Sequence, residues 1–326
     1  MTGLANPQFW AFVGVVAGIF TIFALGLQVQ FGFTGLLNFG HVAFMAIGAY
    51  TMAILTVRTG LSQWVAALIA IAVAMVFGLL IGLPTLRLRA DYLAITTIAF
   101  GEIVRYVALN EERLTGGPQG TINLEGAGTA ARYNDEWLGF QRTVQGRLEA
   151  AIGDAATRDV TMLVIVWTVA LVAIVALQLA TRSPWGRVLR SIREDEDAAS
   201  ALGKNVFSYK LQSLALGAAL GALAGIFFAF QFSFFSPNDF EPLTTFFAYV
   251  IVILGGTARN WGVPLGALIF GFVFAGTRFL DVWPLNALDS AERAYLRLVF
   301  VGLILIGLMA FRPQGILGRR EELVVE

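Results

Sequence analysis

The sequence RSIREDEDAASALGKN, residues 190–205, places four consecutive acidic residues beside a group of arginines. It lies between two apolar runs, residues 160–180 and 211–235, and each run is long enough to form a membrane-spanning helix. Because so many charges are costly in the hydrocarbon core, the stretch must lie in a water-exposed loop between two spans. It therefore predicts a polytopic membrane protein with a charged, helix-prone connector at one membrane surface.

The composition supports this class. Hydrophobic residues make up 57% of the chain, charged residues only 13%, and the mean hydropathy is +0.74, whereas soluble proteins average about 25% charged residues. The net charge is zero and no basic tail is present, so nucleic acid is not an expected partner. The chain has no cysteine and one histidine, His41, which excludes disulfides, thiolate metal sites and an imidazole metal site. A membrane enzyme is disfavoured, since no cluster of nucleophile, base and metal ligands appears.

Runs of about 20 apolar residues, the length that crosses a bilayer, predict an all-α bundle of eight to ten spans. The nine runs are residues 9–28, 33–57, 64–83, 91–109, 160–180, 211–235, 244–258, 262–280 and 295–311. The run 33–57 contains several glycines and Asn38, which is typical of a broken or re-entrant helix that lines a pathway. The run 244–258 is short, so we expect it to tilt or to break at its glycines.

Arginine and lysine residues in the short loops predict the orientation, because such residues favour the cytoplasmic side. With nine spans, all the basic groups fall on one side, and the N-terminus lies outside. These groups are Arg87 with Arg89, residues 182–210, Arg259, and Arg312 with Arg319 and Arg320. Residues 110–159 then form a periplasmic loop segment and residues 181–210 a cytoplasmic loop. If the run 33–57 did not cross, the N-terminus would lie inside.

The cytoplasmic loop has the features of a short helix over residues 192–203. Ser183 suits a helix cap, Pro184 suits the first helical position, and Gly203 is a natural stop. One interpretation is a solvated connector, and the other is a docking helix for a cytoplasmic partner, with charges for register and small residues for close contact. The residues assigned to this docking contact are Arg193, Glu194, Asp195, Glu196, Ala198, Ala199, Leu202 and Gly203.

Several stretches resemble the permeases of ABC transporters for branched-chain amino acids. They are RSIREDEDAASALGKN with SYKLQSLALGAALGALAG (190–205 and 208–225), GLLNFGHVAFMAIGAYT (35–51), LRLRADYLAITTIAFGEI (86–103), LTGGPQG (114–120) and FRPQGILG (311–318). They follow the order and spacing of that family through most of the chain and resemble the permease subunit with the longer outward loop. One departure is Ala258-Arg259-Asn260, where the family usually carries a small Gly-Ser pair.

The resemblance implies a type II ABC importer permease, a single transmembrane domain over residues 1–326 without cofactor or ATPase activity of its own. Its implied partners are two cytoplasmic ATPase subunits that bind ATP, a second homologous permease that makes a heterodimer, and a periplasmic substrate-binding protein, with the permease embedded in the lipid bilayer of the bacterial inner membrane. The nearest approach to a phosphate-binding loop, ASALGKN at 199–205, lacks the required glycine and Ser/Thr, in agreement with an external ATPase.

Alternative functions follow from the same sequence. Related permeases carry urea, short amides or other amino acids, and the residues do not distinguish these substrates from branched-chain amino acids. The alternative class is an ion-coupled secondary transporter or channel, which usually places acidic residues at mid-span. The apolar runs here are nearly free of acids, so the ATP-driven permease is favoured.

Two sets of residues are candidates for roles within the bundle. A zwitterionic amino acid needs helix ends and backbone groups for its charges and an apolar wall for its side chain, and the candidate translocation path is Gly35, Asn38, Phe39, Gly40, His41 and Phe44. Close helix packing is expected at Gly217, Gly221 and Gly225, which recur every four residues. Glu102 and Arg105 are expected to form a structural ion pair near the outward end of their span.

Overall fold

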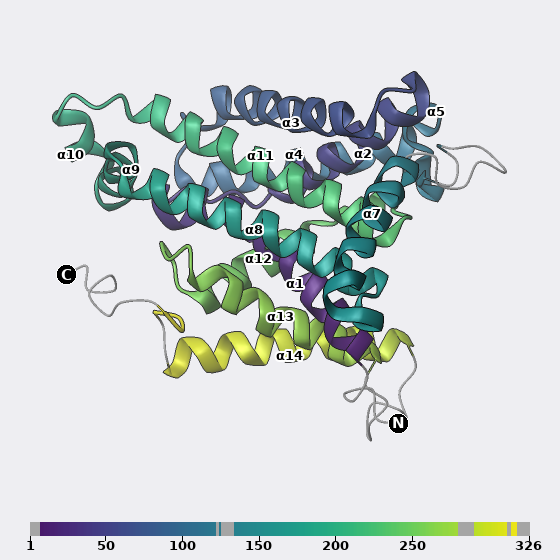
Figure 1. The fold of residues 1–326 in the computed structure, drawn as a ribbon. Helices are drawn as coiled ribbons and strands as arrows, with labels where there is room; N and C mark the ends of the chain where they lie inside the picture. The colour runs from purple at the N-terminus through teal and green to yellow at the C-terminus, as the bar shows by residue number, and fades with distance from the viewer. Residues whose placement is uncertain (1–6, 122–123, 125–133, 280–289, 312–313, 318–326) are drawn as a thin grey trace.

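The computed structural model describes residues 7–121, 124, 134–279, 290–311 and 314–317, and within these ranges the chain is helical without a strand (Figure 1). Six segments are long and apolar enough to cross a membrane. They are α1 (Pro7–Leu27) with its π-helical continuation η2 (Gln28–Phe33), α2 (Val42–Thr59), α3 (Gln63–Thr85), α4 (Ala90–Asn110), α8 (Arg158–Arg182) and α11 (Val206–Phe232).

Shorter elements connect these helices and complete the bundle. They are α5 (Glu112–Thr115), η3 (Gly117–Gln119), α7 (Asp135–Ile152), η5 (Gly153–Ala155), α9 (Pro184–Glu194), α10 (Glu196–Ala201), η6 (Pro237–Phe240), α12 (Pro242–Gly255), α13 (Gly262–Phe279) and α14 (Ser290–Phe311). Each predicted apolar run therefore contains a helix. The predicted break in the run 33–57 is confirmed, because residues 35–41 are not helical and α2 begins only at Val42. The short run 244–258 also breaks at its glycines, since α12 ends where Gly256 takes a φ of 108°.

The loops rich in arginine and lysine lie together at one end of the bundle, at the left of Figure 1 with α9 and α10. The Arg87 guanidinium lies 5.8 Å from the centre of the Phe207 ring, which joins the α3–α4 loop to the start of α11. The Asn260 amide donates to the Thr181 hydroxyl at 3.2 Å, which joins the α12–α13 loop to the end of α8. Three of the four basic groups thus share one end, and Arg312, Arg319 and Arg320 lie outside the described residues.

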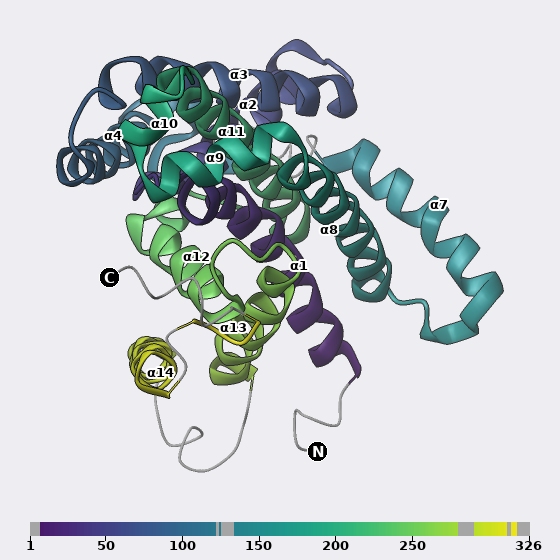
Figure 2. The same ribbon diagram turned by 90° about the vertical axis from the view of Figure 1, so that its left-hand side faces the viewer.

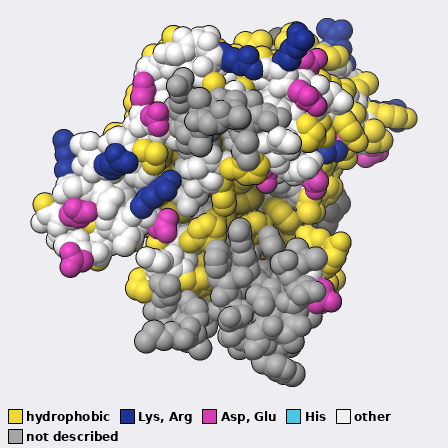
Figure 3. Space-filling model, turned by 90° about the vertical axis from the view of Figure 1, so that its right-hand side faces the viewer, with side chains coloured by type: hydrophobic (Ala, Val, Ile, Leu, Met, Phe, Trp, Pro, Cys, Tyr) yellow, Lys and Arg dark blue, Asp and Glu magenta, His cyan; other side chains and the backbone are white. Residues whose placement is uncertain are grey.

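Helix α7 lies at the opposite end of the bundle, beside α8 (Figure 2). Its first turn is fixed to α3, because the Glu136 carboxylate accepts hydrogen bonds from the Gln63 backbone at 2.8 Å and the Ser62 hydroxyl at 2.9 Å and so satisfies the start of that helix. The buried Trp137 ring stacks on Phe230 of α11 at 4.3 Å. Helix α7 is therefore packed against both α3 and α11. Figure 3, which faces this end, shows acidic and basic side chains interspersed.

The three glycines of α11 face α1 and α2, where the helices approach backbone to backbone. A Cβ added to Gly225 would lie 2.0 Å from the carbonyl oxygen of Met45, and one added to Gly217 would lie 2.0 Å from the side-chain nitrogen of Gln30. Gly221 lies between them, and a Cβ added there would lie 3.0 Å from the Cβ of Phe44 on α2. A larger side chain has no room at these positions, which is the usual role of small residues where membrane helices cross closely.

Candidate functional site

The non-helical segment between η2 and α2 runs through the interior of the bundle, and side chains within and around it accept hydrogen bonds from its backbone. The Phe39 backbone donates to the Thr97 hydroxyl of α4 at 3.1 Å, and the Gly40 backbone donates to the Asn38 side-chain oxygen at 3.0 Å. The Val42 backbone, at the start of α2, donates to the Thr245 hydroxyl of α12 at 3.0 Å. Non-helical backbone at membrane depth requires such partners, because lipid offers none.

Two glycines in this segment are required by its geometry. Gly35 has a φ of 76°, a left-handed conformation that residues with a Cβ rarely adopt. At Gly40 an added Cβ would lie 1.9 Å from the Thr97 carbonyl oxygen, and the backbone of Gly101 also lies against it. Helix α4 therefore contacts the segment directly, and only glycine at position 40 permits this contact.

The candidate path residues divide into buried and accessible ones. Asn38, His41 and Phe44 are buried, and the His41 Nε2 lies 3.1 Å from the carbonyl oxygen of Phe23 on α1. Gly35 is exposed and Phe39 is partly exposed. His41 therefore packs against Phe23 and Phe44 and contacts the backbone of α1. In the described part of the chain, no group of three His, Cys, Asp or Glu residues is placed to hold a metal ion.

Aromatic residues of α12 lie against the accessible part of the segment. The Phe39 ring is 5.2 Å from the ring of Phe246 and 4.8 Å from that of Tyr249, and the Phe246 side chain is 43% exposed. Local sequence patterns did not indicate Phe246, Thr97 or Thr245, which lie far from residues 35–41 along the chain. For Thr97 and Thr245, the one local signal is a hydroxyl group within an apolar run.

The charged loop folds into two short helices, so the prediction of one helix over residues 192–203 is wrong. Helix α9 ends at Glu194, and Asp195 has an extended backbone with φ −153° and ψ 109°. The Asp195 carboxylate then accepts from the Ala198 backbone at 2.9 Å and caps α10. Gly203, with φ 76°, stops α10 as expected.

The residues assigned to docking lie on both faces of this loop. Ala199 is 2% exposed and packs with Ile192 and Val206 in the loop's own small core, so it is not part of the outer surface. Glu196 forms an ion pair with Lys210 of α11. The assigned residues that are exposed are Glu194, Asp195, Glu196, Ala198, Leu202 and Gly203. Among them Leu202 presents a large apolar side chain that is 78% exposed.

Two arginines of α9 bind the end of η2, where the non-helical segment begins. The Arg193 guanidinium donates to the carbonyl oxygen of Gly32 at 2.5 Å, and the Arg190 guanidinium lies 5.7 Å from the centre of the Phe33 ring. A Cβ added to Gly35 would lie 3.8 Å from the Cβ of Arg193. The charged loop is therefore in direct contact with the start of the segment that crosses the bundle.

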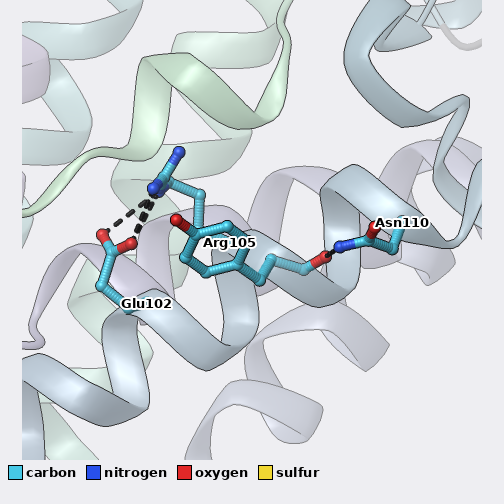
Figure 4. A network of polar contacts seen from close by, with 4 residues as sticks. Glu102, Arg105 and Asn110 are labelled. Atoms are coloured by element: carbon cyan, nitrogen blue, oxygen red, sulfur yellow. Dashed lines mark hydrogen bonds and ion pairs between the residues drawn. The ribbon is translucent and has the colours of Figure 1, made fainter.

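Helix α4 carries an ion pair within its span (Figure 4). The Arg105 guanidinium binds the Glu102 carboxylate, with Nη2 to Oε2 at 2.6 Å and Nε to Oε1 at 3.1 Å, and the side chains are 15% and 28% exposed, respectively. The expected pairing is thus present. Such a pair within one helix contributes about 0.2–0.5 kcal/mol, and the cost of an ionised side chain in a span falls toward the membrane surface, where this pair lies.

Replacing Thr245 with valine tests the support of the non-helical segment. Thr245→Val removes the acceptor for the buried Val42 N–H, so we expect it to lower the free energy of unfolding by about 1–3 kcal/mol, the cost of a buried unsatisfied donor. The control is Thr168→Val, because the exposed Thr168 bonds only within its own helix, to Val164. Thermal unfolding of the two purified variants in detergent measures the effect, and equal melting temperatures would contradict the supporting role.

Comparison with known proteins identifies the family. Residues 10–309 match the family model described as branched-chain amino acid transport system / permease component. LivM of Escherichia coli strain K12, a high-affinity branched-chain amino acid transport system permease protein, is 34% identical over 313 residues, which cover 94% of this chain and 69% of LivM.

More distant relatives agree with this match. The probable branched-chain amino acid transport permease LivM of Methanocaldococcus jannaschii is 25% identical over 92% of this chain and 90% of the relative. BraD of Pseudomonas aeruginosa, a permease of the same description as the Escherichia coli protein, is 26% identical over 94% of each chain. No solved structure matches. The resemblance drawn from the sequence motifs is confirmed, and this multi-pass membrane protein belongs to the family of branched-chain amino acid transport system permease components.

Proposed function

We propose that the chain is the membrane-spanning subunit of an ATP-driven importer that moves branched-chain amino acids across the bacterial inner membrane into the cell. The observation that carries this proposal is the family match over residues 10–309, together with the names of the relatives. The helical bundle with a central non-helical segment supports it, because transporters commonly line their substrate path with broken helices.

The subunit works with three kinds of protein partner in this proposal. One of the two ATPase subunits binds the cytoplasmic loop of residues 181–210, a second related permease completes the membrane pore, and a periplasmic binding protein delivers the amino acid to the opposite end. The clustering of the basic loops at the α9–α10 end supports a cytoplasmic position for that end. The exposed, mostly acidic surface of α10 and Leu202 is the part of this end that the ATPase binds.

Energy reaches the membrane through α9. ATPase movement is transmitted by a rigid element, and α9 is fixed by Arg193 and Arg190 to the end of η2. A displacement of α9 therefore moves the start of the segment 35–41, which contacts α4 at Gly40 and α12 at Phe39. Such a shift of one packed element against others is a common way to switch a transporter between two states.

Reconstitution into liposomes tests the proposed function. We expect this chain, with its paired permease, ATPase subunits and binding protein, to accumulate radiolabelled leucine only when ATP is hydrolysed, because the chain has no phosphate-binding loop of its own. The matched sample omits the ATPase subunits and adds a proton or sodium gradient. Leucine accumulation in that sample would overturn the proposal, as would a binding protein that selects urea or an amide instead.

Changing Leu202 to aspartate tests the docking surface. Leu202→Asp removes an apolar contact at the tip of α10 and adds a charge there, so we expect at least a tenfold loss of ATPase co-purification and of leucine uptake. Because the side chain is almost fully exposed, the subunit itself should remain folded and inserted.

The control for this experiment is Ile152→Asp, the same kind of change at an exposed apolar residue of α7, at the opposite end of the bundle. It should leave ATPase co-purification at the parent level. If Leu202→Asp also assembles and transports like the parent, α10 is only a solvated connector.

A further inference from the structure

The Glu102–Arg105 pair lies inside a membrane span, and its hydrogen bonds run only along its own helix in the described part of the chain. Counted from Asn110, the outer end of α4, Arg105 is about 7.5 Å and Glu102 about 12 Å into the helix at 1.5 Å per residue. Within the described residues neither side chain donates or accepts a hydrogen bond across to another element, although Arg105 also interacts electrostatically with Glu241 at the start of α12. Ionisable residues at such positions usually face a water-filled cavity or a substrate path.

The pair lies on a flank of α4, beside the face of that helix that packs into the bundle, and both side chains are partly buried. Ile98, Glu102 and Arg105 are spaced i, i+4 and i+7 and share one flank of the helix. Thr97 and Gly101, on the neighbouring turn, contact the backbone of Phe39 and Gly40. Both α12 and the preceding η6 also pack against α4. Figure 4 shows the two side chains projecting from α4 on the side where the green chain passes.

The chemistry of this place fits a zwitterion with an apolar side chain. Arg105 uses Nε and Nη2 for Glu102, so in the described structure its Nη1 donors are available to a carboxylate. The Glu102 oxygens keep acceptor capacity for an ammonium group. Phe39, whose backbone binds Thr97 of the same helix α4, and Phe246 of α12 have accessible rings that contact each other and offer an apolar surface. Without substrate, each charge is neutralised by the other.

We propose that Glu102 and Arg105 form a recognition site on the translocation path, where Arg105 binds the α-carboxylate and Glu102 the α-ammonium of the transported amino acid. This inference rests on the proposed function, since it assigns the site at which that substrate passes. The order of the charges along α4 then sets the orientation of the bound amino acid, with its carboxylate toward the outer end of the helix.

Exchanging the two charges is the sharpest test. The variant Glu102→Arg/Arg105→Glu keeps an ion pair on α4 but reverses its order, while Glu102→Gln and Arg105→Gln each remove one charge with little change of shape. In the liposome assay with leucine-loaded binding protein, we expect all three variants to transport at least tenfold less leucine per ATP hydrolysed. ATP hydrolysis stimulated by the loaded binding protein should stay within twofold of the parent, because α9 and α10 are unchanged.

The control is Arg147→Gln, which removes an exposed arginine on α7 and should leave both rates unchanged. The site would be overturned if the exchanged variant transported leucine like the parent. It would also be overturned if the single variants transported like the parent, or if transport, ATP hydrolysis and melting temperature all fell together in the variants. The first and third of these results would show a structural pair. Failure of the parent itself to transport leucine would instead reject the proposed function, so the two failures are distinguishable.

Discussion

The backbone of residues 35–41 leaves the helical hydrogen-bond pattern inside a membrane-spanning bundle, and the surrounding structure supplies what it lacks. The Thr97 hydroxyl accepts from the Phe39 N–H of the segment, the Thr245 hydroxyl accepts from the Val42 N–H directly after it, and the Asn38 amide donates to the side chain of Gln30 in η2. Close approach at Gly40 lets α4 provide this support. Because unpaired polar groups are costly where water is absent, this one requirement constrains α1, α2, α4 and α12 together.

The same segment connects the two ends of the proposed mechanism. At its start, Arg193 of α9 binds Gly32, and α9 continues into the exposed surface of α10. Further along the segment, the Phe39 ring packs against the rings of Phe246 and Tyr249 on α12. Gly40 contacts the backbone of α4, the helix that carries Glu102 and Arg105. When a partner moves the distant cytoplasmic loop, a permease must open its substrate site to the other side of the membrane. A few packed elements with two stable arrangements are enough to produce this change. Here one short segment touches both the loop and the proposed site.

Much of this architecture could be predicted from local features of the sequence. The apolar runs predicted the helices, the glycines around Asn38 predicted the break, and Gly203 predicted the end of α10, because each effect depends on neighbouring residues. The rest depends on distant contacts. Asp195 was expected to contact a partner, yet it caps α10 and interrupts the predicted helix, and Ala199 turns inward against Ile192 and Val206. No local pattern pairs Thr245 with Val42 or Trp137 with Phe230, since only the folded bundle brings them together.

A disulfide between α9 and the non-helical segment tests the central claim, that these two elements move as one unit. The chain has no cysteine, and a Cβ at position 35 would lie 3.8 Å from the Cβ of Arg193, within the range of about 3.5–4.5 Å that a disulfide needs. In the double variant Gly35→Cys/Arg193→Cys, the covalent link replaces the contact made by Arg193, and the reduced form of the same variant is the reference, because a side chain at position 35 strains the left-handed backbone equally in both forms. If α9 and the non-helical segment move as one unit, we expect ATP-dependent leucine uptake of the oxidised protein to equal or exceed that of the reduced protein. Loss of uptake on oxidation, restored by a reductant, would show that the two elements must separate and would contradict the account.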